Sequence, residues 1–218
     1  ARFVTYTMQD GLNCNNVTSI REDTSGGLWL GTWGGGVNRL HDGRFSAITV
    51  TNGLTQDTVL SLFEGRDRSL YVGMDYPGIV NRIKPGGTND FVRPAGMITA
   101  PVRVIHQDQA GGLWIGTSKG LNLLRDGALQ TFTATNGLPG DNITALCESR
   151  AGPIWIGTDG GLSRWADGKF ENITDRDNLP PNDINAIYED NDETLWVGTK
   201  TGGLNRWRTG QWRRYTTA

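Results

Sequence analysis

Short runs of alternating or branched hydrophobic residues recur along the chain, and each run ends in a cluster rich in Gly, Asn, Asp or Pro. The clearest set occupies 101–108, 113–118, 121–126 and 129–135. Alternating hydrophobic and polar positions are typical of half-buried β-strands, and Gly and Asn allow the backbone angles of tight turns. The pattern predicts four consecutive antiparallel strands, and no segment has the period of a helix.

This four-strand unit repeats along the whole chain. The cores LWLGT, LYVGM, LWIGT, IWIGT and LWVGT begin at Leu28, Leu70, Leu113, Ile154 and Leu195. Successive steps are therefore 42, 43, 41 and 41 residues. A second mark, the end of the DGL or NGL turn, keeps the same steps at Leu12, Leu54, Met97, Leu138 and Leu179. A period of about 40 to 50 residues with β character is typical of propeller blades.

We therefore expect an all-β fold, a β-propeller built from five four-stranded antiparallel blades of 41–43 residues. Within a single domain, the blade repeats are expected at 12–53, 54–96, 97–137, 138–178 and 179–218. The N-terminal RFVTYTMQDGL aligns with RFSAITVTNGL from Arg44, so 1–11 is expected to form one additional outermost strand.

The repeated residues are interpreted as scaffold. An aromatic residue in each second strand is expected to fill a blade interface, and the Gly two positions later to allow close approach of the next blade. These aromatic residues are Trp29, Tyr71, Trp114, Trp155 and Trp196. Acidic side chains in the turn before each second strand are expected to cap their own backbone amides rather than to form a metal or acid pair.

The surplus strand leaves three arrangements open. In the first, the chain closes as a five-bladed ring with one end strand displaced. In the second, the chain is a stretch of a longer ring. In the third, two copies of the chain combine through their open ends. An unclosed array exposes a blade face and strand edges, which favours association. A homo-oligomer through open blade ends is therefore one of the expected alternatives.

Composition excludes several classes of function. The 218 residues include 31 glycines and carry a formal net charge of -2, with acids and bases mixed along the chain. This charge pattern offers no basic surface for nucleic acid. No apolar run approaches the roughly 18 residues of a membrane-spanning helix, and no signal peptide is visible at the start. Cys14 and Cys147 occupy different repeat positions, so no disulfide is expected.

The repeats differ most in residue type in two loops, the one before the first strand and the one after the second. Propeller blades place both loops on one face of the disc. The ligand-binding candidates are Trp33, Asp75, Tyr76, Lys119, Asp159 and Lys200 after the second strands, and Asn16, Asp57, Asn142 and Asp183 before the first strands. Trp33 is the strongest, because a flat aromatic side chain in a Gly-rich loop suits a sugar ring or another planar ligand. The alternative is that Trp33 folds back over its own blade.

No catalytic residue, metal site or cofactor is predicted. His41 and His106 lack the spacing and companions of metal ligands. Each Gly cluster connects two strands, so no helix N-terminus is available for phosphate. Carboxylates such as Asp57, Asp141 and Asp183 keep a carbohydrate-active hydrolase or lyase as an alternative, since glycosidases use two carboxylates at a defined separation. A structural or engineered blade array without a ligand is a further alternative.

The combined signature of LWIGT, GGLSR and NGLP resembles the two-component regulator propeller repeat, which occurs in the sensor regions of bacterial hybrid histidine kinases and related signalling proteins. The second repeat departs most, with Met74 in place of Thr and with Asp75, Tyr76 and Pro77 following it. The resemblance implies a periplasmic or extracellular, non-enzymatic sensor module. The ligand it implies is a small molecule or oligosaccharide, recognised for two-component signalling.

Overall fold

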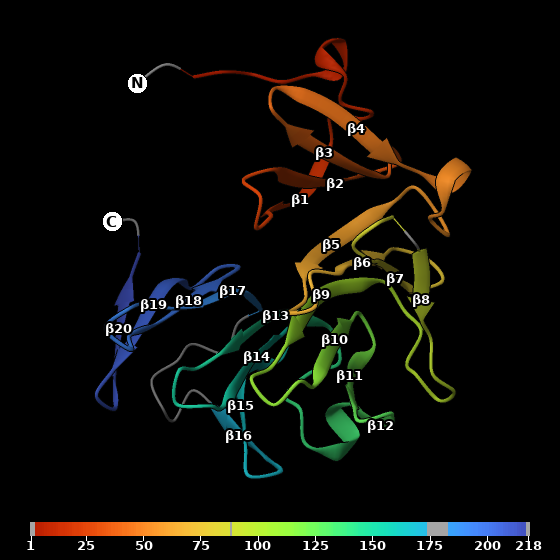
Figure 1. Ribbon diagram of the computed structural model, residues 1–218. Coiled ribbons are helices and arrows are strands. Elements are labelled where there is room, and N and C mark those ends of the chain that lie inside the picture. Colours follow the sequence, from red (N-terminus) through yellow and green to blue (C-terminus); the bar gives the residue numbers. More distant parts are fainter. Residues whose placement is uncertain (1–2, 88, 174–182, 217–218) are drawn as a thin grey trace. The chain divides into compact units, whose positions relative to one another are not determined.

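Strands separated by tight turns make up most of the structure, a computed structural model that describes residues 3–87, 89–173 and 183–216 (Figure 1). Contacts between residues divide the chain into two units. Unit 1 comprises Ala1–Ala95 with Thr99–Ile105, and unit 2 comprises Gly96–Ile98 with His106–Ala218.

Unit 1 contains two complete four-stranded sheets. The first has the order β1 (Val17–Glu22), β2 (Leu28–Thr32), β3 (Val37–His41) and β4 (Arg44–Ile48). The second has the order β5 (Val59–Glu64), β6 (Leu70–Met74), β7 (Val80–Ile83) and β8 (Asn89–Val92). Neighbouring strands are antiparallel, so each sheet is a meander that follows the chain.

The other three sheets follow the same order. The third is β9 (Val102–Gln107), β10 (Leu113–Thr117), β11 (Gly120–Arg125) and β12 (Ala128–Phe132), and β9 runs from unit 1 into unit 2. The fourth is β13 (Ile143–Glu148), β14 (Ile154–Thr158), β15 (Gly161–Ala166) and β16 (Lys169–Ile173). The fifth is β17 (Ile184–Glu189), β18 (Leu195–Thr199), β19 (Gly203–Arg208) and β20 (Gln211–Tyr215). Five four-stranded sheets in the described residues confirm the predicted all-β propeller class.

Close approach between successive sheets depends on the Gly of each second strand, as predicted. A Cβ added to Gly31 would lie 2.6 Å from Val59 Cγ1, and one added to Gly157 would lie 2.6 Å from Ile184 Cγ2. Both distances are shorter than any side chain tolerates. The first strand of the next sheet therefore packs directly onto this backbone.

The aromatic residue beside that Gly packs at the same interface. Trp29 lies against a buried cluster that includes Val59 and Leu70 of the second sheet. Trp155 belongs to a cluster with Ile184 and Leu195 of the fifth sheet. The structure thus confirms the scaffold interpretation for these two tryptophans.

The extra N-terminal strand predicted over 1–11 is wrong in the described residues. Residues 3–7 form no strand, and Met8–Asp10 forms the short 3-10 helix η1. Thr7 Oγ1 accepts a hydrogen bond from Gln9 N, and Asp10 accepts one from Thr7 N. A strand needs a neighbouring strand for its ladder, whereas β4, with which this segment aligns, is paired with β3.

The same cap shortens the outermost strand of the third sheet. The strand predicted over 129–135 ends at Phe132, and Ala134–Asn136 forms the 3-10 helix η3. The side chain of Asn136 accepts a hydrogen bond from Thr133 N at 2.5 Å, and such local bonds compete with a strand ladder. A third helix of this kind, η2, spans Val50–Asn52.

Candidate functional site

In unit 1, Thr58 joins the two candidate loops of neighbouring sheets. Thr58 forms an isolated antiparallel bridge with Trp33, and its carbonyl accepts a hydrogen bond from Asp75 N at 3.3 Å. Trp33 N also donates to Asn16 O at 2.9 Å. Trp33 is 51% exposed and Tyr76 is 77% exposed. Two exposed aromatic residues therefore stand on loops that share one anchoring residue.

Asp57 supports the loop that carries Trp33. Its carbonyl accepts hydrogen bonds from Gly34 N at 3.2 Å and from Gly36 N at 2.8 Å. Its carboxylate accepts a hydrogen bond from Val50 N at 2.8 Å. Asp57 thus holds the Gly-rich turn in place, and at least one carboxylate oxygen is committed to the backbone.

In unit 2, the candidate loops are paired in the same way within single sheets. Asp159 N donates to Asn142 O at 3.2 Å, and Asn142 N donates to the Asp159 carboxylate at 3.3 Å. Lys200 N donates to Asp183 O at 2.9 Å, and Lys200 Nζ lies 3.3 Å from the Asp183 carboxylate. Lys119 is exposed, and its backbone N–H donates to Thr117 Oγ1 at 3.1 Å.

The ten sequence-derived candidates thus divide equally between the units. Unit 1 holds Asn16, Trp33, Asp57, Asp75 and Tyr76, and unit 2 holds Lys119, Asn142, Asp159, Asp183 and Lys200. Within each unit the structure brings candidates together by backbone hydrogen bonds between the loop before the first strand and the loop after the second. Exposed aromatic candidates occur in the unit 1 set alone.

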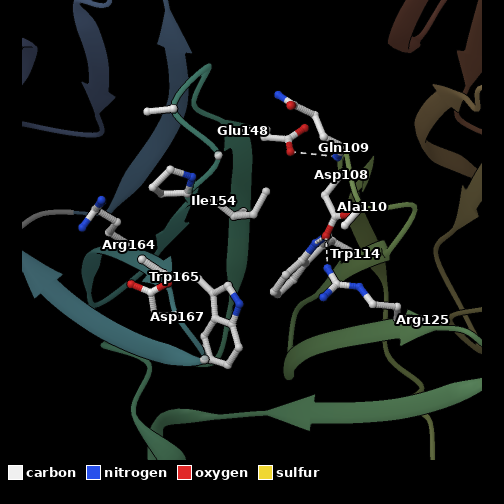
Figure 2. Close-up of a pocket in the computed structure, with 15 residues that line it drawn as sticks. Asp108, Gln109, Ala110, Trp114, Arg125, Glu148, Ile154, Arg164, Trp165 and Asp167 are labelled. Carbon is white, nitrogen blue, oxygen red and sulfur yellow. Dashed lines mark hydrogen bonds and ion pairs between the residues drawn. The ribbon is translucent and has the colours of Figure 1, made fainter.

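A cavity of about 570 Å³ lies between the third and fourth sheets of unit 2, and sequence reasoning missed it (Figure 2). Its polar lining comes from the turns after β9, β13 and β15 and from strand side chains. The charged residues are Asp108, Arg125, Glu148, Arg164 and Asp167. The indoles of Trp114 and Trp165 also line it, with ring centroids 5.9 Å apart.

Asp108 is the most constrained carboxylate of this cavity. It accepts hydrogen bonds from Gly112 N at 2.7 Å and Trp114 Nε1 at 2.8 Å, and it forms an ion pair with Arg125. Burial opposes ionisation, but these hydrogen bonds and the Arg125 charge outweigh it and lower the pKa of Asp108 below its ordinary value. Asp108 therefore stays charged and locked to its own sheet.

The same arrangement recurs in other sheets, which marks it as structural. Asp23 accepts hydrogen bonds from Ser25 N and Gly27 N and pairs with Arg39 at 2.7 Å. Asp190 accepts one from Trp196 Nε1 at 2.9 Å. Burial opposes ionisation of Asp23 too, but its hydrogen bonds hold the pKa below the ordinary value. The expected turn capping is thereby confirmed, with an indole or an arginine added that the prediction lacked.

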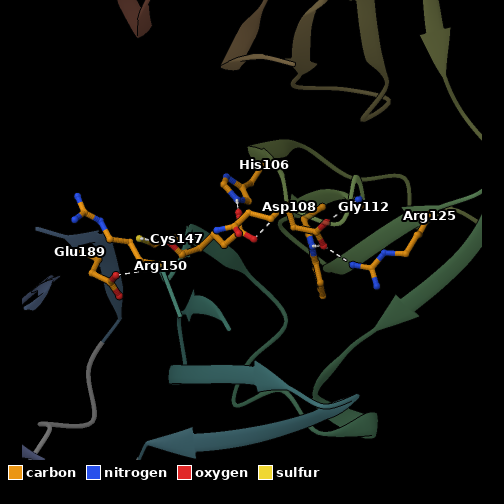
Figure 3. A network of polar contacts seen from close by, with 10 residues as sticks. His106, Asp108, Gly112, Arg125, Cys147, Arg150 and Glu189 are labelled. Carbon is orange, nitrogen blue, oxygen red and sulfur yellow. Dashed lines mark hydrogen bonds and ion pairs between the residues drawn. The ribbon is translucent and has the colours of Figure 1, made fainter. Parts of the chain in front are cut away.

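A line of polar contacts links successive sheets of unit 2 (Figure 3). Glu148 accepts a hydrogen bond from Gln109 N at 2.8 Å, and its other oxygen lies 3.3 Å from His106 Nε2. Glu189 likewise accepts a hydrogen bond from Arg150 N at 2.9 Å. In each case, a carboxylate at the end of a first strand caps the turn of the preceding sheet. His106 thus makes a polar contact with the following sheet.

A second cavity of unit 2, of about 460 Å³, lies between the fourth and fifth sheets. Its lining includes Trp155, Trp207 and Trp212, together with Glu189 and Glu193. Trp155 and Trp207 pack edge to face with centroids 6.0 Å apart, and both belong to the buried cluster of this interface. These indoles primarily fill the space between sheets.

The sequence contains a signal for one part of the first cavity, the contact between an Asp in the turn and a Trp in the second strand. Three turns combine an Asp with a Trp six positions later, as in Asp23–Trp29, Asp108–Trp114 and Asp190–Trp196. The spacing predicts an indole to carboxylate hydrogen bond once a hairpin places the two side chains on one face. The space beside that pair depends on how two sheets meet, which the sequence pattern does not contain.

No group of three or more His, Cys, Asp and Glu side chains among residues 3–87, 89–173 and 183–216 is arranged to hold a metal ion. None of the helices described there has the length and hydropathy to cross a bilayer. Cys14 and Cys147 are free thiols.

A family profile matches four segments of the chain, and its description is "two component regulator propeller". The matched segments are residues 11–34, 96–119, 137–160 and 178–201. Each segment contains the first and second strands of one four-stranded sheet. Four of the five repeats therefore match the two component regulator propeller model. The second repeat, which carries Met74 and Tyr76, is not among the matched segments, in line with its divergent sequence.

Extracellular domains of two hybrid two-component systems have folds similar to almost the whole chain. The extracellular domain assigned to hybrid two-component system BT3049 of B. thetaiotaomicron shows 22% identity and a TM-score of 0.81 over 95% of this chain. That of BT4673 from the same organism shows 24% identity and a TM-score of 0.77 over 94%. This chain spans only 30% and 28% of those two chains.

Enzymes share the fold as well. Virginiamycin B lyase from Staphylococcus aureus shows 15% identity and a TM-score of 0.76, over 92% of this chain and 69% of the lyase. At this identity the likeness concerns the fold alone. Comparison with curated protein sequences gives no significant match.

Proposed function

We propose that this regulator propeller chain is a non-enzymatic recognition module of a two-component sensor, and that it binds an oligosaccharide or a similar small ligand outside the cytoplasm. The observation that carries the proposal is the anchoring of Trp33 and of the Asp75–Tyr76 loop to the same residue, Thr58. The extracellular origin of the two sensor domains with the same fold supports the location.

The unit 1 loops have the chemistry that a sugar ring requires. Trp33 and Tyr76 offer exposed aromatic faces, which pack against the apolar C–H surface of a sugar while hydroxyls bond to nearby polar groups. Asn16 and Asp75 lie on the same loops and supply such groups. The cavities of unit 2 are weaker candidates, because their charged and aromatic residues already bond and pack with one another.

Catalysis is the less favoured alternative. General acid and base chemistry on a glycosidic bond needs two carboxylates that face the substrate. The carboxylates that kept this alternative open are already engaged: Asp57 accepts from Val50 N, Asp141 accepts from Ala134 N, and Asp183 pairs with Lys200. Turnover of a bound glycan, lost on replacing one of these aspartates, would favour the enzyme over the sensor.

A glycan array followed by calorimetry with the best ligand tests the proposal. Trp33→Ala and Tyr76→Ala should each weaken binding more than about 10-fold, because an exposed ring loses its whole contact area with the ligand. Phe91→Ala is the matched control, since Phe91 is an exposed aromatic residue on β8 of the same unit. Unchanged affinity in both loop variants would contradict the site, and an array without any ligand would favour a purely structural blade array.

A further inference from the structure

The fourth sheet lacks the aspartate that other sheets of unit 2 use to hold their second-strand tryptophan. In the third and fifth sheets, this turn aspartate accepts a hydrogen bond from the indole N–H at 2.8 and 2.9 Å. In the fourth sheet, Ser149 stands in its place, six positions before Trp155. The Ser149 hydroxyl accepts a hydrogen bond from Ala151 N within its own turn. Trp155 is therefore a second-strand tryptophan without its usual acceptor.

Trp155 lines the cavity of about 460 Å³ between the fourth and fifth sheets and is only 5% exposed. In the part of the chain that the structure describes, its indole N–H donates to no acceptor. A buried donor without an acceptor is unfavourable unless water or a ligand supplies one. The cavity volume lies in the range of small-molecule pockets, roughly 300–1,000 Å³. An acceptor atom bound in this cavity would satisfy the Trp155 donor.

Three indoles from three strands line this cavity. Trp207 on β19 and Trp212 on β20 are partners in the strand register, and both are half-buried. The rings of Trp155 and Trp207 lie edge to face, with an interplanar angle of 60°. Indole rings carry a negative electrostatic potential over their faces, which attracts organic cations.

The cation that accompanies such a ring in the first sheet is missing here. Arg39 lies opposite Trp29 in the strand register, and its Cζ is 5.2 Å from the centroid of that ring. Arg164 lies opposite Trp155 in the same way, but its guanidinium pairs with Glu171 at 2.7 Å. Among the described residues, no arginine or lysine lies over any of the three cavity indoles. The protein thus leaves these rings without a cation of its own.

The charged lining of the cavity is predominantly negative. Its cation, Arg164, is neutralised by its ion pair. Glu189 accepts a hydrogen bond from the backbone of Arg150 (Figure 3), whose guanidinium donates to Asn191 instead. Glu193 also lines the cavity, and its carboxylate makes no hydrogen bond or ion pair within the described residues. Two carboxylates are thus present without a cationic partner there.

We propose that this cavity binds a small organic cation, an ammonium compound that carries a hydrogen-bond acceptor a few bonds from the nitrogen, as choline does. The ammonium group packs on the indoles beside Glu189 and Glu193, and the acceptor oxygen receives the Trp155 N–H. The cavity shares no residue with the loops of Trp33 and Tyr76 in unit 1. The two proposed sites differ in ligand chemistry, and neither depends on the other.

Titration calorimetry with choline tests the proposal. The matched ligand is the uncharged alcohol in which carbon replaces the choline nitrogen, since it has the same shape and the same hydroxyl. Choline should bind at least about 10-fold more tightly, because attraction to the indole faces and to the carboxylates requires the charge. Equal affinities for the two compounds, or no choline binding at high millimolar concentration, would overturn the proposal.

Variants locate the bound cation. Trp212→Ala should weaken choline binding more than about 5-fold, because a ring that contacts the desolvated cation is lost. Glu193→Gln should weaken it more than about 2-fold through the lost charge. Asp192→Asn is the control for charge, since Asp192 lies in the same turn but does not line the cavity. Trp33→Ala is the control for an indole, and both controls should bind choline like the parent chain.

Circular dichroism should show that every variant is folded. Glu193 is an exposed turn residue, so its variant tests the site even if Trp212→Ala does not fold. Unchanged affinity in Glu193→Gln and in a folded Trp212→Ala would contradict the site. Loss of choline binding in Trp33→Ala would move the ligand to the unit 1 loops and also overturn it.

Discussion

The indole N–H of Trp114 donates a 2.8 Å hydrogen bond to Asp108, a carboxylate that also accepts from Gly112 N and pairs with Arg125. This contact ties the turn before β10 to the strand that follows it. It also keeps a charge at a position that is nearly inaccessible to water. The relationship connects the stability of the blade to the protonation of one residue.

Replacing Asp108 by Asn should lower the free energy of unfolding by about 2–3 kcal/mol, because the buried Trp114 indole and the partly exposed Arg125 lose a charged acceptor. Urea denaturation followed by circular dichroism measures this change. Asp67→Asn is the control, since Asp67 occupies the equivalent turn but bonds to the backbone and hydroxyl of Ser69. We expect less than about 1 kcal/mol for it. Equal losses in both variants would contradict a special role for the Trp114 contact.

Acid should destabilise the chain through the same residue. Despite its burial, the hydrogen bonds of Asp108 hold its pKa below the ordinary value of 3.8, so the folded state binds a proton less readily than the unfolded state. Its contribution to stability is complete above that ordinary value and is lost as the pH falls through the lowered folded pKa. Melting temperatures between about pH 5 and pH 2 should therefore fall more steeply for the parent than for Asp108→Asn. Parallel pH profiles would exclude this linkage.

The second-strand glycines should differ in their tolerance of a methyl group. Gly157→Ala should cost about 1–3 kcal/mol, because its Cβ would lie 2.6 Å from Ile184 of the next sheet. Gly198→Ala should leave the free energy of unfolding of the isolated chain almost unchanged, since its nearest neighbour is 3.8 Å away. Chemical denaturation provides the comparison. A similar cost at both positions would contradict the difference in local space between Gly157 and Gly198.

The two thiols should report on different parts of the molecule. Burial raises the pKa of the Cys147 thiol, so its reaction with a thiol reagent at pH 8 should be slower than that of a free thiol by about 10-fold or more. Cys14 Sγ lies 3.2 Å from Trp33 O, so a ligand on the unit 1 loops should slow its labelling without affecting Cys147. Mass spectrometry of single-cysteine variants distinguishes the two rates. Equal protection of both thiols by the ligand would contradict binding at the unit 1 loops.

Local pattern was sufficient to predict the strands and their repetition. The core that begins at Leu113 specifies strand β10, and the turns that flank it specify its antiparallel neighbours. These features depend on residues close together in the sequence, and five copies repeat the information. The role of Gly31 and Gly157 was predictable for the same reason, since each copy needs one close approach.

The N-terminal segment shows where pattern misleads. Residues 3–7 have the composition of a strand, yet they form none, because a ladder needs a partner strand and composition does not supply one. The ten candidate residues likewise remain predictions as ligand contacts. Their loops were predictable, whereas the anchoring of Trp33 and Asp75 to Thr58 depends on the meeting of two sheets.

The sequence by itself determined the period, the strand order and the residues that repeat, because hairpins form between neighbouring segments. Tertiary structure alone decided that a cavity lies between the third and fourth sheets, and that Thr58 anchors the loops of both Trp33 and Asp75. Cavities and contacts between sheets depend on what packs against a residue from elsewhere in the chain, and a repeated local pattern does not contain that information.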